Sequence, residues 1–187
     1  MWLYYADTCG LDAARAISRG RTSSAGSAFA WSLLAFAARE SWGLRELPPV
    51  ELDARGKPCF AGVAGRCFSL SHTSGHVLAA LSEEPVGADI EALREPPARL
   101  LATATEQELE SFGFFGLWTL RESVYKLCGE GSLRTMRFSL SGGGIVAPVS
   151  GVHSRLYEAA GCCAAVSAYG GDFAERLIIV PPEEICT

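Results

Sequence analysis

Two segments about thirty residues apart have different hydrophobic periods, and together they set the local structure of the middle of the chain. The segment Val86-Gly-Ala-Asp-Ile-Glu91 alternates apolar and polar residues, which predicts a strand with Asp89 and Glu91 on one face. The segment Trp118-Thr-Leu-Arg-Glu-Ser-Val-Tyr-Lys126 has the helical period instead, with Trp118, Glu122 and Lys126 four residues apart. The opposite side of this helix carries an apolar stripe, made of Leu117, Leu120, Val124 and Leu127. The sequence therefore predicts a strand with two carboxylates, followed by a helix with a third carboxylate and an amine.

Three carboxylates that converge repel one another unless a cation lies among them. Hard oxygen ligands suit Mg²⁺ or Mn²⁺ rather than zinc, and such an ion commonly meets a phosphate. Each segment alone also fits an ordinary interpretation. Asp89 and Glu91 could line a solvated strand face, and Glu122 with Lys126 could be an exposed ion pair that contributes about 0.3 to 0.5 kcal/mol. The joint order of the segments and the lysine count favour the metal site.

Lysine is rare in this chain, because only Lys57 and Lys126 are lysines among sixteen basic residues. Where arginine is so strongly preferred, a lysine suggests a site that needs a compact ammonium able to release a proton, which arginine cannot do. Lys57 lies in the turn-like stretch Arg55-Gly-Lys-Pro58.

Four segments between Gly56 and Gly129 occur in the order and at about the spacing of a known family: Gly56-Lys-Pro58, Phe68-Ser-Leu-Ser-His-Thr73, Val86–Glu91 and Trp118–Lys126. In this order they resemble the 4'-phosphopantetheinyl transferases of the larger, surfactin-synthetase-activating type. The sequence departs from the family pattern at Arg121, which replaces the usual lysine, and at Ala88, which replaces a branched residue. Its amino-terminal part also looks short.

The resemblance implies an α+β fold of two similar lobes in a pseudo-twofold arrangement. Each lobe would be an antiparallel sheet with helices, covering residues 1–88 and 89–187, with the site in the cleft between them. The implied activity moves the 4'-phosphopantetheine group of coenzyme A to a serine of an acyl or peptidyl carrier protein. This reaction depends on Mg²⁺ and releases adenosine 3',5'-bisphosphate.

The resemblance also implies roles for individual residues. Asp89, Glu91 and Glu122 would hold Mg²⁺ (or Mn²⁺) against the pyrophosphate. Glu122 would be the base for the serine hydroxyl, and Lys126 would neutralise or protonate the leaving side.

Six further residues are expected to bind coenzyme A. The resemblance implies that Lys57, Ser71 and His72 approach its phosphates. Each also fits an ordinary role: Lys57 could be a solvated turn lysine, Ser71 a plain strand serine, and His72 a histidine hydrogen-bonded to backbone. Arginine suits bidentate phosphate contacts. Their chemistry therefore suggests that Arg15, Arg19 and Arg21 contact the 3'-phosphate of coenzyme A, although they could equally be surface arginines.

Composition narrows the functional class. About half of the 187 residues are apolar, which is enough for a proper core. No apolar run reaches the length of a membrane span, and the start lacks the basic residues of a secretory signal, so a cytoplasmic protein is expected. Residues 76–130 carry four basic and ten acidic side chains. The sequence lacks the basic excess that is typical of nucleic-acid-binding proteins. The seven cysteines show no paired metal-ligand spacing and are predicted to be reduced core residues.

The remaining pattern predicts helices and strands in both halves. A strand at 2–5 and helices at 11–18 and 25–41 come first, followed by strands at 67–71, 77–82 and 86–91 that read as one small antiparallel sheet. Thr105 to Glu108 predicts a capping box, Gly113 an interruption, and 114–128 a longer helix. Strands are then expected at 137–140, 152–157, 163–169 and 176–180.

Two other functional classes fit the same residues. The chain could be a relative that binds coenzyme A or a carrier protein without turnover, or a metal-dependent nucleotide pyrophosphate hydrolase that uses water in place of serine. A fused two-lobe chain has no need of a trimer, so a monomer is expected.

Overall fold

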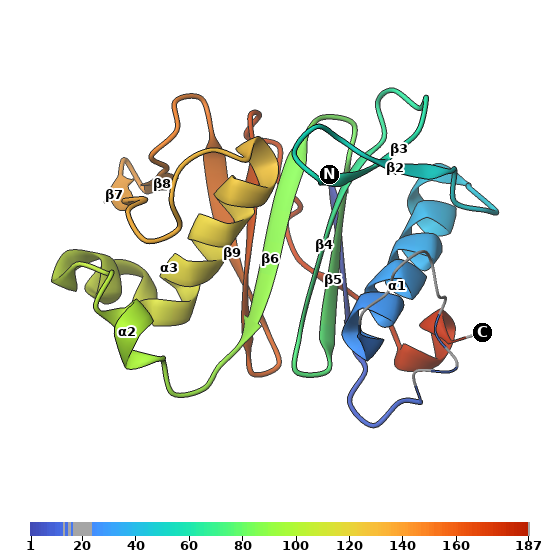
Figure 1. The fold of residues 1–187 in the computed structure, drawn as a ribbon, viewed down its shortest axis with the longest axis horizontal. Helices are drawn as coiled ribbons and strands as arrows, with labels where there is room; N and C mark the ends of the chain where they lie inside the picture. The colour runs from blue at the N-terminus through green and yellow to red at the C-terminus, as the bar shows by residue number, and fades with distance from the viewer. Residues whose placement is uncertain (13, 15, 17–23, 187) are drawn as a thin grey trace.

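The computed structural model describes residues 1–12, 14, 16 and 24–186, and it arranges two sheets between two helices (Figure 1). The first sheet has the strand order β11-β1-β5-β4, and the second has the order β6-β10-β9-β8-β7. Helix α1 (Ala25–Trp42) covers the first sheet, and helix α3 (Glu106–Cys128) covers the second. The first sheet consists of β1 (Trp2–Asp7), β4 (Cys67–Thr73), β5 (His76–Ser82) and β11 (Ile178–Ile179). The second consists of β6 (Val86–Ala92), β7 (Ser139–Ser141), β8 (Gly144–Val146), β9 (His153–Ala159) and β10 (Cys162–Ala168).

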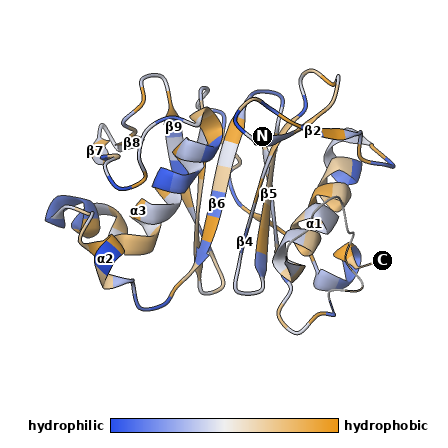
Figure 2. Ribbon diagram, viewed as in Figure 1, coloured by the Kyte–Doolittle hydropathy of each residue, from blue (hydrophilic) through white to orange (hydrophobic). Residues whose placement is uncertain are grey.

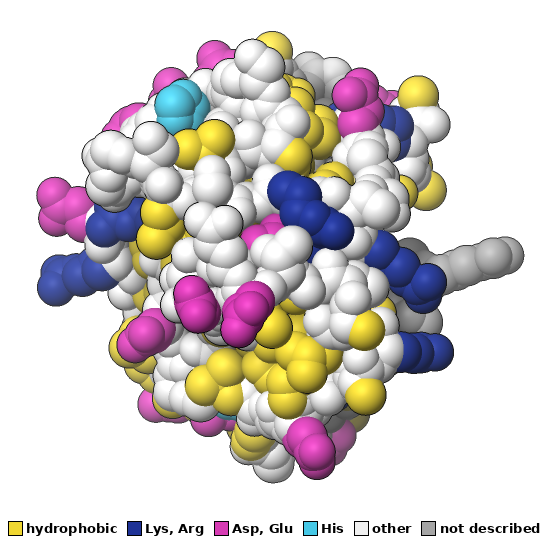
Figure 3. Space-filling model, turned by 90° about the vertical axis from the view of Figure 1, so that its left-hand side faces the viewer, with side chains coloured by type: hydrophobic (Ala, Val, Ile, Leu, Met, Phe, Trp, Pro, Cys, Tyr) yellow, Lys and Arg dark blue, Asp and Glu magenta, His cyan; other side chains and the backbone are white. Residues whose placement is uncertain are grey.

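Smaller elements complete the fold. Strands β2 (Val50–Leu52) and β3 (Pro58–Phe60) form a separate hairpin, α2 (Ala98–Leu101) precedes α3, and a 3₁₀ helix, η2 (Pro182–Ile185), packs near α1. The α3 side of the molecule exposes apolar side chains beside acidic ones (Figure 3). No helix in the described ranges is long and apolar enough to cross a lipid bilayer.

The core follows from the period of the strands. On β5, Val77, Ala79 and Leu81 pack toward α1, whereas Leu78 and Ala80 pack toward the second sheet, and none of the five is exposed. Alternate residues of a strand point to opposite faces, so this uniformly apolar strand is buried on both sides. Figure 2 shows the hydrophobic residues of β5 and β6 in the middle of the molecule. The two sheets therefore share one apolar interface, and each packs its other face against a helix.

Strands β4 and β6 meet at the seam between the sheets through side chains. The Ser69 hydroxyl oxygen accepts a hydrogen bond from the Ala88 N–H at 2.9 Å, and the Thr73 hydroxyl donates to a Glu91 carboxylate oxygen at 3.3 Å. The prediction of one small sheet from the strands near 67–91 was wrong in this respect, because β4 pairs with β5 but β6 pairs with β10. The polar residues of β4 thus face the acidic strand across the seam.

The helix boundaries follow local capping chemistry. Ser24 caps α1 by accepting from the Ser27 N–H, and the predicted capping box of Thr105 and Glu108 begins α3. Gly113 interrupts α3 as predicted, with a φ of 64° that a side chain would disfavour.

The α+β class with antiparallel sheets is confirmed. The predicted strands near the amino terminus, at 67–82 and at 152–169 are found, with bounds shifted by a few residues. The carboxy-terminal strand β11 pairs in parallel with β1 and so joins the first sheet. Half of the predicted helix at 11–18 lies outside the described residues. The division at residue 88 falls within β6, and both it and the pseudo-twofold pairing of lobes stay predictions.

Candidate functional site

The backbones of β6 and α3 are in direct contact at Gly87. A Cβ atom at this position would lie 2.0 Å from the carbonyl oxygen of Ser123 and 2.5 Å from the backbone nitrogen of Leu127. The apolar stripe of α3 is buried against the second sheet as predicted, with Leu117, Leu120, Val124 and Leu127 at most 1% exposed. The polar face of the helix is thereby held beside the strand that carries Asp89 and Glu91.

Asp89 is the point where three elements meet. Its Oδ1 accepts hydrogen bonds from the Ser71 hydroxyl of β4 and from the Lys126 ammonium of α3, each at 2.7 Å. The Lys126 ammonium also lies 3.0 Å from the Ser71 hydroxyl oxygen. The Asp89 side chain is 7% exposed and that of Lys126 is 28% exposed, so this ion pair is largely shielded from water. Residues from both sheets and from α3 therefore form one polar junction.

The second carboxylate oxygen of Asp89 has no partner. Oδ2 is buried and makes no hydrogen bond to any residue that the structure describes. A buried charged oxygen without a partner is costly. Burial, followed by the nearby charge of Asp89, raises the pKa of both Glu91 and Glu122. The three carboxylates thus repel one another, and one of their oxygens, Oδ2 of Asp89, is unpartnered. A hard divalent cation would bind such oxygens and neutralise their charge.

The same acids are not arranged as a closed cage. Within the described ranges, Asp89, Glu91 and Glu122 do not form a group whose ligand oxygens all lie within 4.8 Å of one another. Lys126 instead contacts Oδ1 of Asp89. The three carboxylates and the unpartnered oxygen suit a hard cation chemically. They lie at one site, but their oxygens are not already spaced as the ligands of a single ion.

The raised pKa values of Glu91 and Glu122 predict how pH changes stability. A carboxyl group with a raised pKa in the folded state binds its proton more tightly there than in the unfolded chain. Stability is therefore expected to fall as pH rises from the ordinary glutamate range through the raised values. Added Mg²⁺ should remove this loss. Urea unfolding at several pH values, with and without Mg²⁺, measures it, and a stability that rises through this window in metal-free protein would contradict the arrangement of the acids.

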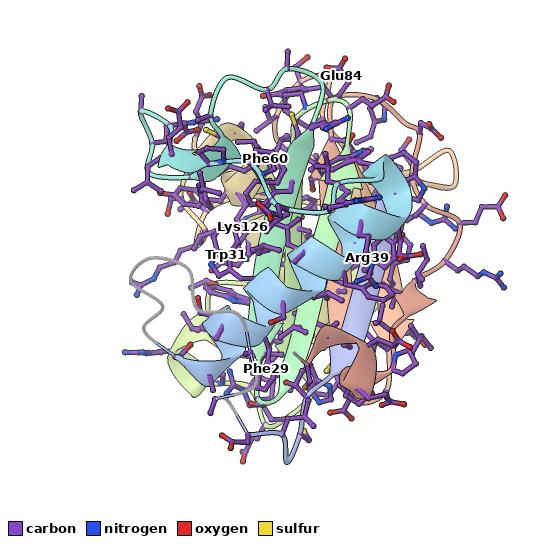
Figure 4. The ribbon with its side chains drawn as sticks, turned by 90° about the vertical axis from the view of Figure 1, so that its right-hand side faces the viewer. Phe29, Trp31, Arg39, Phe60, Glu84 and Lys126 are labelled. Atoms are coloured by element: carbon purple, nitrogen blue, oxygen red, sulfur yellow. The ribbon has the colours of Figure 1, made fainter. Side chains whose placement is uncertain are left out.

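A pocket of about 260 Å³ adjoins the polar junction and contains both lysines. Its lining includes Lys57, Phe68, Tyr125 and Lys126. The Lys57 ammonium donates to the carbonyl oxygen of Val86 at 2.5 Å, and burial lowers the pKa of this lysine. In Figure 4, Lys126 lies below Phe60 and above Trp31. The ring of Phe68 contacts the rings of both Phe60 and Trp31. The pocket thus combines three cationic residues, Arg55 and the two lysines, with the aromatic rings of Phe68 and Tyr125.

The other residues predicted to bind a phosphorylated ligand lie around this junction or outside the described residues. Ser71 is in the junction itself. His72 is exposed at the next position of β4, but part of its ring is covered by the first turn of α1, where a Cβ atom on Gly26 would lie 2.7 Å from Nδ1. Partial burial, followed by the charge of Lys126, lowers the pKa of His72. Arg15, Arg19 and Arg21 fall outside the residues that the structure describes.

Comparison with known proteins tests the resemblance to a family. No family model matches the sequence. The chain is 29% identical over 150 residues to the 4'-phosphopantetheinyl transferase Sfp of Bacillus subtilis, covering 70% of this chain and 67% of that protein. It is 31% identical over 94 residues to the 4'-phosphopantetheinyl transferase psf-1 of Bacillus pumilus, covering 43% and 40% of the two chains. A third relative, the 4'-phosphopantetheinyl transferase AcpT of Salmonella typhimurium, is 32% identical over 105 residues, covering 48% of this chain and 54% of AcpT. These similarities confirm the resemblance to the 4'-phosphopantetheinyl transferases.

The matched regions cover the relatives to different extents. The chain spans about half the length of AcpT and 40% of psf-1, but two thirds of Sfp. One of the two residues that depart from the family pattern, Arg121, has a structural explanation. It is 1% exposed, lies 3.4 Å from a carboxylate oxygen of Glu108 and donates to the Thr103 hydroxyl at 2.9 Å. Arg121 therefore fastens α3 to the loop before it and is not part of the polar junction.

The sequence did not predict two residues that support this site. Thr73 contacts Glu91 from β4, and the alternation of Ser69, Ser71 and Thr73 was the signal that could have identified it. The guanidinium of Arg55 donates to the carbonyl oxygen of Cys128 at the carboxy-terminal end of α3. A cation is favourable at that end of a helix. Arg55 thus connects the β2–β3 hairpin to the helix that carries Glu122 and Lys126.

Proposed function

We propose that this protein transfers the 4'-phosphopantetheine group of coenzyme A to a serine hydroxyl of an acyl or peptidyl carrier protein and releases adenosine 3',5'-bisphosphate. The observation that carries the proposal is the junction of Ser71, Asp89 and Lys126, with a buried, unpartnered oxygen on Asp89. The names of the relatives support the same activity.

Asp89, Glu91 and Glu122 would hold Mg²⁺ (or Mn²⁺). When bound, the ion supplies positive charge to the pyrophosphate oxygens, on which negative charge builds during transfer. The three acids come from β6 and α3, whose backbones are in contact at Gly87.

Glu122 is proposed as the general base for the carrier serine. Its raised pKa makes it a better proton acceptor than an exposed glutamate, and the efficiency of a base rises as its pKa approaches the working pH. Lys126, one helical turn further along α3, presents an ammonium at the same junction. It would offset the charge that develops on the leaving phosphate.

The pocket beside the junction is proposed to take the phosphates of coenzyme A. Lys57 and Lys126 supply charge there, and Phe68 and Tyr125 supply an apolar wall. Ser71 and His72 would contact the phosphates from β4, and Arg15, Arg19 and Arg21 are proposed to meet the 3'-phosphate. We also propose that the protein acts as a monomer, because the junction is built from a single chain.

Intact-mass measurement of apo carrier proteins tests the proposal. Incubation with coenzyme A and Mg²⁺ is expected to add the mass of phosphopantetheine to at least one fatty-acid, polyketide or peptide carrier, and a chelator should prevent the gain. A panel of all three carrier types with no gain in mass would overturn it. Calorimetric binding of coenzyme A without product would then indicate a non-catalytic binding relative. Release of adenosine bisphosphate without a carrier would indicate a pyrophosphate hydrolase.

A further inference from the structure

A second group of potential metal ligands lies away from the proposed transfer site. Asp7 at the end of β1, Cys9 just after it, and His76 at the start of β5 bring one ligand atom each within 4.8 Å of one another. Among the residues that the structure describes, this is the one such group of three His, Cys, Asp or Glu side chains. It contains one oxygen, one sulfur and one nitrogen donor. That mixture differs from the all-oxygen set of Asp89, Glu91 and Glu122.

The backbone brings these three residues together by register. Asp7 and His76 are directly opposite each other in the β1–β5 ladder. The segment after β1 is fastened to the β4–β5 turn, because the backbone N–H of Thr8 donates to the carbonyl oxygen of Gly75 at 2.6 Å and its hydroxyl donates to the same oxygen at 2.7 Å. The position of the thiol is thus determined by the pairing of two chain segments far apart in sequence.

Gly75 is required for the thiol to reach this position. A Cβ atom there would lie 2.4 Å from the Cys9 sulfur, and the residue has a φ of 84°. A non-glycine residue at this position would both strain the turn and push the thiol away. The turn therefore provides space for the Cys9 side chain beside His76.

Hydrogen bonds also fix the positions of the ligand groups. The backbone N–H of Cys9 donates to Oδ1 of Asp7 at 2.9 Å, and the Cys9 thiol donates to the carbonyl oxygen of Ser74 at 3.6 Å. The Tyr5 hydroxyl and Nδ1 of His76 share a hydrogen bond of 2.8 Å. This hydrogen bond fixes the orientation of the imidazole, and the same Nδ1 lies 4.0 Å from Oδ1 of Asp7.

We propose that Asp7, Cys9 and His76 bind a borderline-soft divalent cation of the Zn²⁺ class. Zinc takes sulfur, nitrogen and carboxylate oxygen together, whereas Mg²⁺ prefers oxygen alone. On binding, the Cys9 thiol gives its proton to water and its sulfur becomes a thiolate ligand. Three protein ligands leave further positions of the ion for water. The ion joins the end of β1 to the tip of the β4–β5 hairpin.

Binding at this tip has a structural connection to the acidic strand. Thr73 pairs with His76 across the two-residue turn, and the Thr73 hydroxyl contacts Glu91. An ion that orders the tip therefore also orders one of the partners of Glu91. The proposal does not depend on the proposed transfer activity, since none of the three ligands belongs to the polar junction.

Cobalt(II) is the probe that tests the site, because a cobalt–thiolate bond gives a near-ultraviolet charge-transfer band that oxygen ligands do not give. The full chain is freed of metal with a chelator, exchanged into buffer with excess Mg²⁺ and titrated with Co²⁺. We expect the band to saturate at one equivalent and Zn²⁺ to displace it. Absence of a thiolate band would overturn the proposal.

Three variants assign the ligands. Cys9→Ser is expected to abolish the band and to weaken Zn²⁺ binding about tenfold or more, since even the loss of an outer partner of a metal ligand has an effect of that size. Asp7→Asn should keep the band but weaken binding. The matched control is Cys59→Ser, which removes a partly buried thiol that contacts the Glu51 carbonyl oxygen instead. A band that survives Cys9→Ser, unchanged affinity in Asp7→Asn, or loss of the band in Cys59→Ser would each contradict the assignment.

Discussion

Glu122→Gln is expected to lower kcat/KM for phosphopantetheine transfer by about 1,000-fold, a loss within the range for removal of a general base. The amide has the same shape as the carboxylate but cannot accept the serine proton. It also removes one negative charge from the group that would hold the cation. Because Glu122 is partly buried beside Asp89 and Glu91, and its pKa is raised by burial and then by Asp89, the substitution relieves repulsion in the folded state. The fold should therefore be retained, with stability equal to or above that of the wild type.

The matched control for this variant is Glu110→Gln, which changes an exposed glutamate on the same helix. It should transfer at the wild-type rate. Rates measured with saturating coenzyme A and carrier, together with circular dichroism and urea unfolding of each variant, separate a chemical loss from a structural one. Wild-type rates in Glu122→Gln would refute its role as the base. Equal losses in both variants would point to a general effect of charge on α3.

The sequence predicted the local structure around the site because the two segments that build it are strongly periodic. Alternation in the segment of Asp89 and Glu91 specified which face is polar, and the four-residue spacing of Glu122 and Lys126 specified the polar face of α3. Both faces are confirmed by the burial of the residues opposite them. The roles of these side chains are a different matter. The structure brings them to one region, and the assignment of metal, base and phosphate contacts stays a prediction.

The pairing of strands could not be read from the sequence, because a ladder partner is chosen by tertiary packing. The short turn at Ser82-Glu-Glu-Pro85 suits a hairpin, which favoured β6 as the neighbour of β5. In the fold, β6 instead pairs with β10, and its apolar side packs against β5 across the interface between the sheets. The strands β2, β3 and β8 have three residues each, too few to show a period.

The group of Asp7, Cys9 and His76 could not be predicted for the same reason, because it depends on strand pairing. Its members have no metal-ligand spacing in the sequence, and only the β1–β5 register brings them together. The prediction that the cysteines fill the core holds for Cys128 and Cys162, which are buried, but Cys9 was wrongly placed, since it is exposed beside the turn. Arg121 shows a related effect, because its burial against Glu108 depends on the loop before α3.

Gly87→Ala is expected to destabilise the protein by about 3 kcal/mol, at the upper end of the usual cost of overpacking. The added Cβ would lie 2.0 Å from the Ser123 carbonyl oxygen and 2.5 Å from the Leu127 backbone nitrogen. Because both atoms belong to the backbone of α3, no side chain can rotate away, and the helix itself must shift from β6. The φ of Gly87 is not in the left-handed region, so the effect is due to the close approach alone.

This shift should also abolish transfer in the molecules that remain folded. The 2.7 Å contact between Lys126 and Asp89 joins the helix to the strand, and a displaced helix would move Lys126 and Glu122 away from the acids of β6 together. Urea unfolding and the specific activity of the folded fraction measure the two effects. The control is Gly116→Ala, also on α3, where a Cβ atom would have its nearest neighbour at 3.5 Å. That variant should be stabilised by about 0.5 to 1 kcal/mol, because alanine is a better helix former, and should keep its activity. Wild-type stability in Gly87→Ala would mean that α3 does not rest on β6 as described, and the geometric basis for gathering the three acids would be lost with it.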